Sequence, residues 1–218
     1  MSAPSEEQKK QQTCLVPYLE ADDAPPEVAG MLKGMPYRRN LMHLLAHAHG
    51  VYPRLLSVYL TLFDDTRRIL PQVDWWLIAL RIPVVLDAKY QWEANEPVAR
   101  LHGMSEEKVA AIKRTAPALT AGKLPEDNVE LLEKEEVFTP RDRAILRMVD
   151  EQLLTYDNLE ETVKLAREYL SVEELVELYI VLGEYALVGR ITKGLRCDLD
   201  GEIPGIKEKL KKVEALGK

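Results

Sequence analysis

Hydrophobic positions recur every three or four residues along most of the chain, which is the spacing of an amphipathic α-helix. The segment 40–49 places Leu41, Leu44 and Leu45 on one such face, and a second helix is expected over 53–64. The strict alternation of a half-buried strand persists nowhere in the sequence. The pattern therefore predicts an all-α fold.

Two neighbouring segments predict a helical hairpin at the centre of the molecule. Residues 73–85 are almost all apolar, as in a helix that is covered on every side. Pro83 near its end is expected to stop or kink that helix, because proline lacks the backbone N–H that the ladder needs. The next helix is expected over 88–102, with Gly103 at its C-terminal side.

Cap residues predict further helices in the second half. Thr139 followed by proline begins a helix that is expected to run to about Tyr156. The pairs Asn158 with Glu161 and Ser171 with Glu174 have the spacing of capping boxes, in which each side chain bonds the other residue's backbone N–H.

The second of these boxes opens a long helix, expected over 172–194. Gly183 lies inside it and is expected to let another helix approach closely, since glycine in a helix otherwise lowers stability by roughly 1 kcal/mol relative to alanine. Residues 115–137 are instead expected to form a linker or irregular crossing, because two prolines and a glycine interrupt them.

The 218 residues are enough for one large domain. Residues 1–22 are polar and charged and are expected to form a disordered tail. Residues 23–200 form the predicted helical domain, and 201–218 a C-terminal helical tail.

Charge and cysteine content exclude several classes of protein. The formal net charge of −7 argues against a broad surface for nucleic acid or anionic membrane. No apolar run is long enough to cross a bilayer, and the polar N-terminus is not a secretory signal. Cys14 and Cys197 stand far apart in sequence and share no motif spacing, so we expect no disulfide framework and a cytoplasmic, reducing location.

Three groups of residues carry motifs in a fixed order. They are Asn40–His47 followed by Pro53; Trp76–Arg81 with Tyr90–Trp92 and Ala99–Ser105; and Glu177-Leu178 with Gly183, Tyr185 and Arg190. Together they resemble the carboxymuconolactone decarboxylase and AhpD-like family over about residues 40–200. The resemblance implies an AhpD-like helical bundle built around a core helical hairpin. It also implies a homo-oligomer, which the apolar run 75–86 supports.

The departures from the family pattern decide which chemistry remains. The peroxidase branch has a glutamate in place of Trp76, cysteines in place of Ala88 and Gln91, and a histidine in place of Asn95. Positions 88, 91 and 95 still fall on one helix face and are expected to line one wall of a pocket. Peroxidase chemistry needs a thiolate, so we reject a thiol peroxidase.

The altered wall is expected to contact a substrate through Trp76, Arg81, Ala88, Tyr90, Gln91 and Asn95. Trp76 offers a broad apolar face for stacking, and Gln91 and Asn95 are amides that orient a carbonyl or hydroxyl. Arg81 is suited to hold a carboxylate or phenolate. The alternative for Arg81 is an ion pair with Asp74 or a bond to a helix end.

The acid or base of a reaction is expected to be Glu96, His47 or Tyr185. Tyr185 equally fits an ordinary core tyrosine whose hydroxyl is bonded. His43 and His47 stand four residues apart, but no third ligand accompanies them, so we expect no metal site and no cofactor.

Two functions remain open. The first is a cofactor-free, non-redox decarboxylase, lyase or isomerase that acts on a small cyclic or aromatic organic acid or lactone. The second is a non-catalytic protein that binds a small molecule or forms oligomers around a decayed AhpD-like site. The space beside Trp76 separates them, because a plugged pocket favours the second function and an open cavity favours the first.

Overall fold

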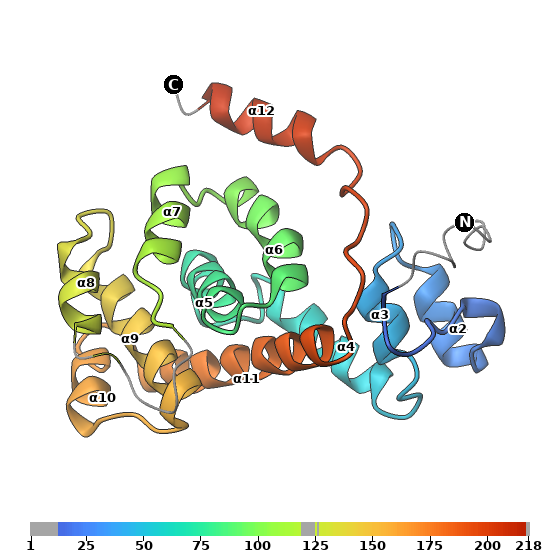
Figure 1. Cartoon of the computed structure of the whole chain (residues 1–218), viewed down its shortest axis with the longest axis horizontal. Helices are drawn as coiled ribbons and strands as arrows, with labels where there is room; N and C mark the ends of the chain where they lie inside the picture. The colour runs from blue at the N-terminus through green and yellow to red at the C-terminus, as the bar shows by residue number, and fades with distance from the viewer. Residues whose placement is uncertain (1–12, 119–124, 126, 217–218) are drawn as a thin grey trace.

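The computed structural model describes residues 13–118, 125 and 127–216, and this part of the chain is all-α, with no β-strand. Figure 1 shows α5 in the middle of the bundle, α6 and α7 on one side of it and α11 on the other. The elements are η1 (Ala21–Asp23), α2 (Pro26–Lys33), α3 (Asn40–Leu45), α4 (Tyr52–Leu62), α5 (Gln72–Val85), α6 (Lys89–Leu101), α7 (Glu106–Arg114), α8 (Asn128–Lys134), α9 (Pro140–Thr155), α10 (Glu160–Ala166), α11 (Val172–Gly194) and α12 (Ile206–Leu216).

The central helix α5 is covered on all sides, as its apolar sequence predicts. Every residue from Trp75 to Ile82 is at most 1% exposed. The helix packs against α6, α7, α9 and α11. Burying each large apolar side chain contributes roughly 1.5–3 kcal/mol, so α5 is the main source of the core's stability. Pro83 lies in its last turn, and the helix ends two residues later at Val85.

The predicted hairpin of α5 and α6 is joined by a tight turn. The backbone N–H of Ala88 donates to the carbonyl of Pro83 (2.8 Å), and that of Asp87 donates to Val84 (3.3 Å). Asp87 has a positive φ of 52°. This is the Schellman arrangement, which ends a helix with one left-handed residue. The turn lets α6 begin at Lys89 and fold back on α5.

Two capping boxes fix the starts of the longest helices. Thr139 and Asp142 bond each other's backbone N–H at the start of α9. Ser171 and Glu174 do the same at the start of α11, as predicted. A side-chain cap contributes roughly 1 kcal/mol. The box predicted at residue 158 is wrong, because α10 begins after Leu159 without a side-chain cap.

The side chain of Asn158 has other partners. Its amide donates to the carbonyl of Met148 and to the carboxylate of Glu151 (both 3.0 Å). That carboxylate is 2% exposed and also accepts from the backbone N–H of Leu159 (3.0 Å). A buried carboxylate is stable only when hydrogen-bond donors surround it. The Glu151 carboxylate therefore binds Asn158 and the turn between α9 and α10.

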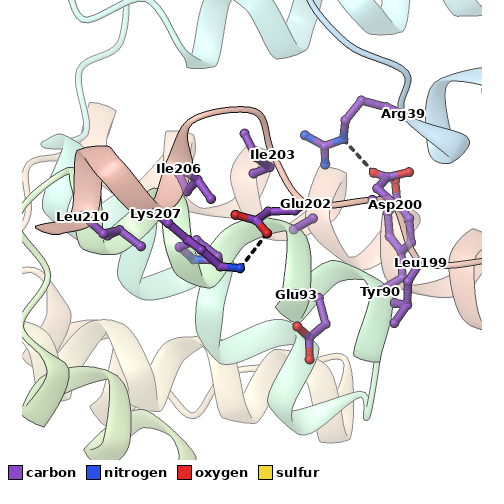
Figure 2. Close-up of a pocket in the computed structure, with 13 residues that line it drawn as sticks. Arg39, Tyr90, Glu93, Leu199, Asp200, Glu202, Ile203, Ile206, Lys207 and Leu210 are labelled. Carbon is purple, nitrogen blue, oxygen red and sulfur yellow. Dashed lines mark hydrogen bonds and ion pairs between the residues drawn. The ribbon is translucent and has the colours of Figure 1, made fainter.

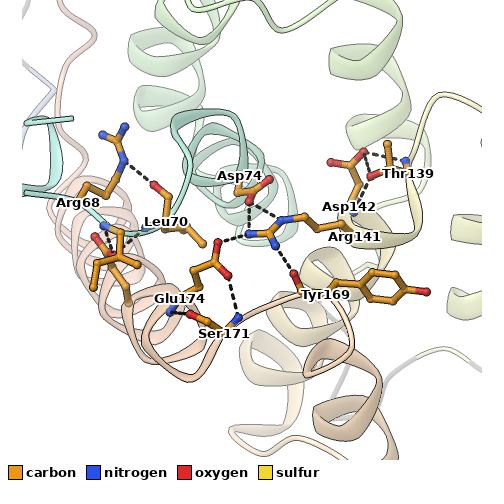
Figure 3. Close-up of polar contacts among 11 residues, drawn as sticks. Arg68, Leu70, Asp74, Thr139, Arg141, Asp142, Tyr169, Ser171 and Glu174 are labelled. Atoms are coloured by element: carbon orange, nitrogen blue, oxygen red, sulfur yellow. Dashed lines mark hydrogen bonds and ion pairs between the residues drawn. The ribbon is translucent and has the colours of Figure 1, made fainter. Parts of the chain in front are cut away.

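A second polar cluster holds three helices together (Figure 3). Arg141 of α9 donates to Asp74 of α5 (2.8 Å), to Glu174 of α11 (2.6 Å) and to the carbonyl of Tyr169. Burial raises the pKa of Asp74, and the hydrogen bond from Arg141 opposes that rise. The charge of Arg141 therefore compensates a carboxylate that the core has removed from water.

Two expectations about irregular positions are corrected. The segment 115–137 contains the helix α8, whose Leu132 is 2% exposed. Gly183 is exposed, and a Cβ added there would meet no other atom within 4 Å. Close approach occurs instead at Gly189, where a Cβ would lie 3.1 Å from Leu86 and 3.2 Å from Gln91.

The first described residues lie against the segment that follows α11. Residues 1–12 of the expected disordered tail lie outside the described residues, but Thr13 donates from its backbone N–H to Asp198 (2.8 Å) and Leu15 to the carbonyl of Leu195 (2.9 Å). Residues 13–22 are therefore held in place. After Asp198 the chain runs beside α6 and continues into α12, which packs against α6 (Figure 1). None of the described helices is long and apolar enough to span a membrane.

Candidate functional site

The wall expected on α6 faces the interior of the protein. Ala88 is 3% exposed and Gln91 is 1% exposed. The Gln91 amide donates to the backbone carbonyl of Tyr185 on α11 (2.9 Å). Because Gly189 has no side chain, α11 lies directly against both residues. Asn95 is half-buried one turn further along α6. Ala88 and Gln91 thus join two helices, while Asn95 stands apart from that contact.

Trp76 is part of the hydrophobic core and is 1% exposed. Its ring lies 4.5 Å from that of Trp75 and stacks at 5.6 Å on His102, measured between centroids. Phe63 meets it edge-on at 6.4 Å. Contacts of this kind are typical of packed aromatic clusters. Trp76 therefore fills the space that the family pattern gives to a reactive residue, and its ring is already covered by protein.

Arg81 is an internal ion-pair partner, with 0% of its surface exposed. Its guanidinium binds Asp150 of α9 through two hydrogen bonds (2.7 and 2.6 Å). The remaining donors bond the carbonyls of Ile112 and Thr115 and the Thr115 hydroxyl (2.7–2.8 Å). All five N–H groups are thereby used. The structural alternative for Arg81 holds, although its partner is Asp150 and not Asp74.

The three candidate acids or bases lie in different surroundings. His47 is exposed, and its Nε2 donates to the carbonyl of Pro17 (2.8 Å). Tyr185 is 6% exposed in the core beside Trp75, and burial raises its pKa. Glu96 is half-buried and lies 3.8 Å from Arg100, and burial raises its pKa. The structure does not bring these groups together.

A cavity of about 350 Å³ lies between α6 and the end of the chain (Figure 2). We call residues 198–210 the strap and this space the strap cavity. Its lining is Arg39, Tyr90, Glu93, Ala94, Pro97, Leu199, Asp200, Gly201, Glu202, Ile203, Ile206, Lys207 and Leu210. Aliphatic side chains from both walls line it together with two ion pairs, Arg39 with Asp200 and Lys207 with Glu202. Such a lining suits a small molecule with an apolar body.

One end of the strap cavity is an ordered polar cluster. The Tyr90 hydroxyl donates to Asp200 (2.6 Å), and Arg39 forms an ion pair with the same carboxylate (3.0 Å). Asp200 also accepts from the backbone N–H of Asn40 (2.7 Å), and Tyr90 accepts from that of Leu41 (3.2 Å). Burial and the negative charge of Asp200 raise the pKa of Tyr90, so its hydroxyl keeps its proton at neutral pH.

A second cavity of about 270 Å³ adjoins the first, and we call it the neighbouring cavity. Tyr90 and Leu199 line both spaces. The neighbouring cavity reaches the first turn of α6 at Ala88 and is also lined by Cys197. Ala88 and Tyr90 are therefore the residues of the predicted wall that reach either cavity.

Known protein families and curated proteins give no match to this sequence. Solved structures do match. A peroxidase-related protein from Ralstonia eutropha with an alkylhydroperoxidase AhpD core has a TM-score of 0.66, with 13% identity over 87% of this chain and 94% of that one. The debrominase Bmp8 in complex with 2,3,4-tribromopyrrole has a TM-score of 0.63, with 15% identity over 93% and 98% of the two chains.

The chain has the AhpD-like fold. At such low identities the likeness concerns the fold alone. The predicted fold class is therefore confirmed, including the core hairpin on which the fold is built. Of the four positions that the resemblance assigns to reactive residues, Trp76, Ala88 and Gln91 are packed into the core or against α11, and Asn95 is half-buried.

Sequence reasoning missed most of the strap cavity. Arg39 and Asp200 stand 161 residues apart in the sequence, and neither lies in a motif that indicates a functional site. Tyr90 was found through its place in a family motif. The apolar positions Ile203, Ile206 and Leu210 are the one local signal, since they indicate that the C-terminal tail has a face to bury.

We predict that Asp200→Ala loosens the strap. The substitution removes the acceptor that Tyr90, Arg39 and the Asn40 amide share, so residues 198–210 lose one of their polar anchors. Trypsin should then cut the native protein after Lys207 or Lys209 at least about tenfold faster, because cleavage follows the population of the locally open form. Asp157→Ala, at an exposed position outside the strap, is the control and should leave the rate unchanged. Equal rates for both variants would show that Asp200 does not hold the strap.

Proposed function

We propose that this AhpD-like protein binds a small, largely apolar molecule in the strap cavity, without thiol chemistry. The cavity itself carries the proposal. Its volume of about 350 Å³ falls within the usual range for ligand pockets, roughly 300–1,000 Å³. Ala94, Pro97 and Ile203 supply apolar walls, and Tyr90 with Arg39 supplies a polar end. A few polar groups in an apolar pocket are the usual means of orienting a ligand.

Binding is favoured over catalysis by the positions of the three acid or base candidates that the sequence analysis named. General acid–base catalysis requires a proton-active group within hydrogen-bond reach of the substrate. Glu96, His47 and Tyr185 are absent from the lining of both described cavities. The Trp76 side chain fills the space around it. A pocket plugged in this way favours the non-catalytic function. Both observations fit a protein whose family site has lost its reactive residues and whose ligand binds in a different cavity nearby.

Peroxidase chemistry has no support in this arrangement. Ala88 and Gln91 carry no thiol, and burial raises the pKa of Cys197 to about 12. A protonated thiol is a poor nucleophile toward a hydroperoxide. The activities named for the two similar structures, a relation to peroxidases and debromination, are therefore not extended to this chain.

The charges at the cavity favour a neutral ligand over the expected organic acid. Arg81 has no donor left for a carboxylate, and Arg39 is already paired with Asp200. Glu202 in the same lining is paired with Lys207 (2.7 Å), and Glu93 adds a further negative charge. A carboxylate would be repelled there, whereas a ring compound with a hydroxyl or carbonyl group could bond Tyr90 or Arg39.

We predict that Ala94→Trp blocks the strap cavity, because an indole at this wall takes up much of the available volume. The affinity for an uncharged naphthylamine dye, whose fluorescence rises in apolar surroundings, should fall by at least about tenfold. Native mass spectrometry should also show less co-purifying small molecule. Ala48→Trp, at an exposed position, controls for the added indole. Unchanged dye affinity in Ala94→Trp would refute ligand binding in this cavity.

A cofactor-free lyase or isomerase is the second candidate, and one observation favours it. The Tyr90 hydroxyl is bonded to a carboxylate where the two cavities meet, and such a pair can pass a proton to a bound substrate. Positioning of the substrate would supply the remaining rate enhancement.

This candidate predicts that the protein consumes a compound from a small-molecule extract of the source cells, followed by untargeted mass spectrometry. Tyr90→Phe should lower that turnover at least about 100-fold, since it removes the proton while keeping the ring. Dye binding should persist in the variant. Turnover that survives in Tyr90→Phe would exclude Tyr90 as the acid, and loss of carbon dioxide from the compound would identify a decarboxylase.

We also propose that the protein forms a homo-oligomer, although not through the run 75–86, which this chain's own helices cover. Val172, Val176 and Ile180 lie four residues apart on α11 and are 49%, 55% and 47% exposed. Ile69 is 56% exposed, and its N–H bonds Glu177 of the same helix. This apolar stripe is of the kind that marks protein interfaces.

Light scattering should therefore give a mass of at least two chains for the purified protein. Val176→Lys places a charge in the stripe and should shift the protein toward the monomer, because burying an unpaired charge is costly. Val51→Lys, at an exposed apolar position at the start of α4, should leave the mass unchanged. If the unmodified protein is already a monomer, the proposed homo-oligomer is refuted.

A further inference from the structure

The two cysteines lie on segments that run side by side, although they stand at opposite ends of the sequence. Leu15 donates from its backbone N–H to the carbonyl of Leu195 (2.9 Å). The backbone N–H groups of Thr13 and Cys14 point at the carboxylate of Asp198 (2.8 and 3.4 Å). Residues 13 to 15 therefore lie against residues 195 to 198, so the segments that carry Cys14 and Cys197 are neighbours in space.

Tyr18 also contacts residues 197 and 198, where the two segments lie together. The Tyr18 hydroxyl lies 3.8 Å from the sulfur of Cys197 and accepts from the backbone N–H of Asp198 (2.9 Å). The Thr13 hydroxyl donates to Asp198 (2.6 Å). Both cysteines are free thiols with half-buried side chains. Several contacts thus hold together the two segments that carry the thiols.

The two thiols also influence each other electrically. Burial is the main reason that the pKa of Cys197 is raised, and the charges of Asp200, Cys14 and Asp198 add to the rise. The expectation of no disulfide framework was based on distance along the sequence, whereas a disulfide depends on distance in space.

We propose that Cys14 and Cys197 form an intrachain disulfide when the protein meets a disulfide oxidant such as oxidised glutathione. The thiolate of one cysteine attacks a glutathione sulfur, which forms a mixed disulfide and expels one glutathione thiolate. The other cysteine loses its proton to solvent and attacks the protein sulfur of that mixed disulfide. The second glutathione then leaves, so two protein thiols are oxidised and one glutathione disulfide is reduced to two thiols.

The cross-link would act on the strap. Cys197 and Thr13 line the neighbouring cavity, and Leu199 two residues later lines both cavities. A covalent bond at Cys197 fixes the start of the strap to the N-terminal segment. It also closes nearly the whole chain into one loop, which restricts the unfolded state and raises the unfolding temperature of the oxidised protein. This inference does not depend on the proposed ligand.

The test uses the reduced full-length protein incubated with oxidised glutathione. The intact mass should fall by two hydrogen atoms without a glutathione adduct, and both free thiols should disappear. Trypsin should then release peptide 11–33 linked to peptide 197–207. The link should form at least about tenfold faster in the folded protein than in urea, because folding raises the effective concentration of one thiol at the other.

Variants separate the proposed geometry from general thiol reactivity. Cys14→Ser and Cys197→Ser should each stop at a mixed disulfide with glutathione. Asp198→Ala removes the contacts that align the segments and should slow the cross-link toward its rate in urea, whereas Asp157→Ala at an exposed site should not. Glutathione adducts on both cysteines, disulfide-linked dimers, or equal rates with and without urea would each overturn the proposal.

Discussion

The buried ion pair between Arg81 and Asp150 sets the orientation of the central helix, on which the other elements pack. Both side chains are 0% exposed, and the same guanidinium bonds the last turn of α7 through Ile112 and Thr115. Removing one member of such a pair typically costs about 3–5 kcal/mol, because the other charge stays buried without compensation. Rotation of α5 about its axis would break these bonds together. The pair therefore determines which face of α5 each neighbour meets.

That fixed orientation explains why the AhpD-like site is closed in this chain. With Arg81 directed at α9 and α7, Trp76 meets Phe63 and His102 and fills its side of the helix. On the next helix, Gly189 lets α11 contact Ala88 and Gln91 directly. Close packing leaves few voids between regular helices. Space remains instead where an irregular segment crosses α6, and the strap cavity lies there.

Local signals account for what could be predicted from the sequence. Apolar residues on every face identified α5, and a capping box identified α11, because each depends on residues within a few positions of one another. The same signal gave a wrong prediction at Asn158, because its amide binds the buried carboxylate of Glu151 and does not cap α10. The polar end of the strap cavity could not be predicted. It depends on Asp200 meeting Tyr90 and Arg39, and such a long-range contact leaves no spacing pattern.

Helix α6 contributes residues both to the site expected from the family resemblance and to the strap cavity. Successive residues of an α-helix point about 100° apart. Gln91 therefore faces α11, where its amide bonds the Tyr185 carbonyl, while Tyr90 faces the strap and Asp200. The inner face of α6 packs against α11 through Gln91, and Tyr90 on the outer face lines the strap cavity. In our proposal a binding function has thus passed from one face of α6 to the adjacent face, without any change in the backbone that both faces share.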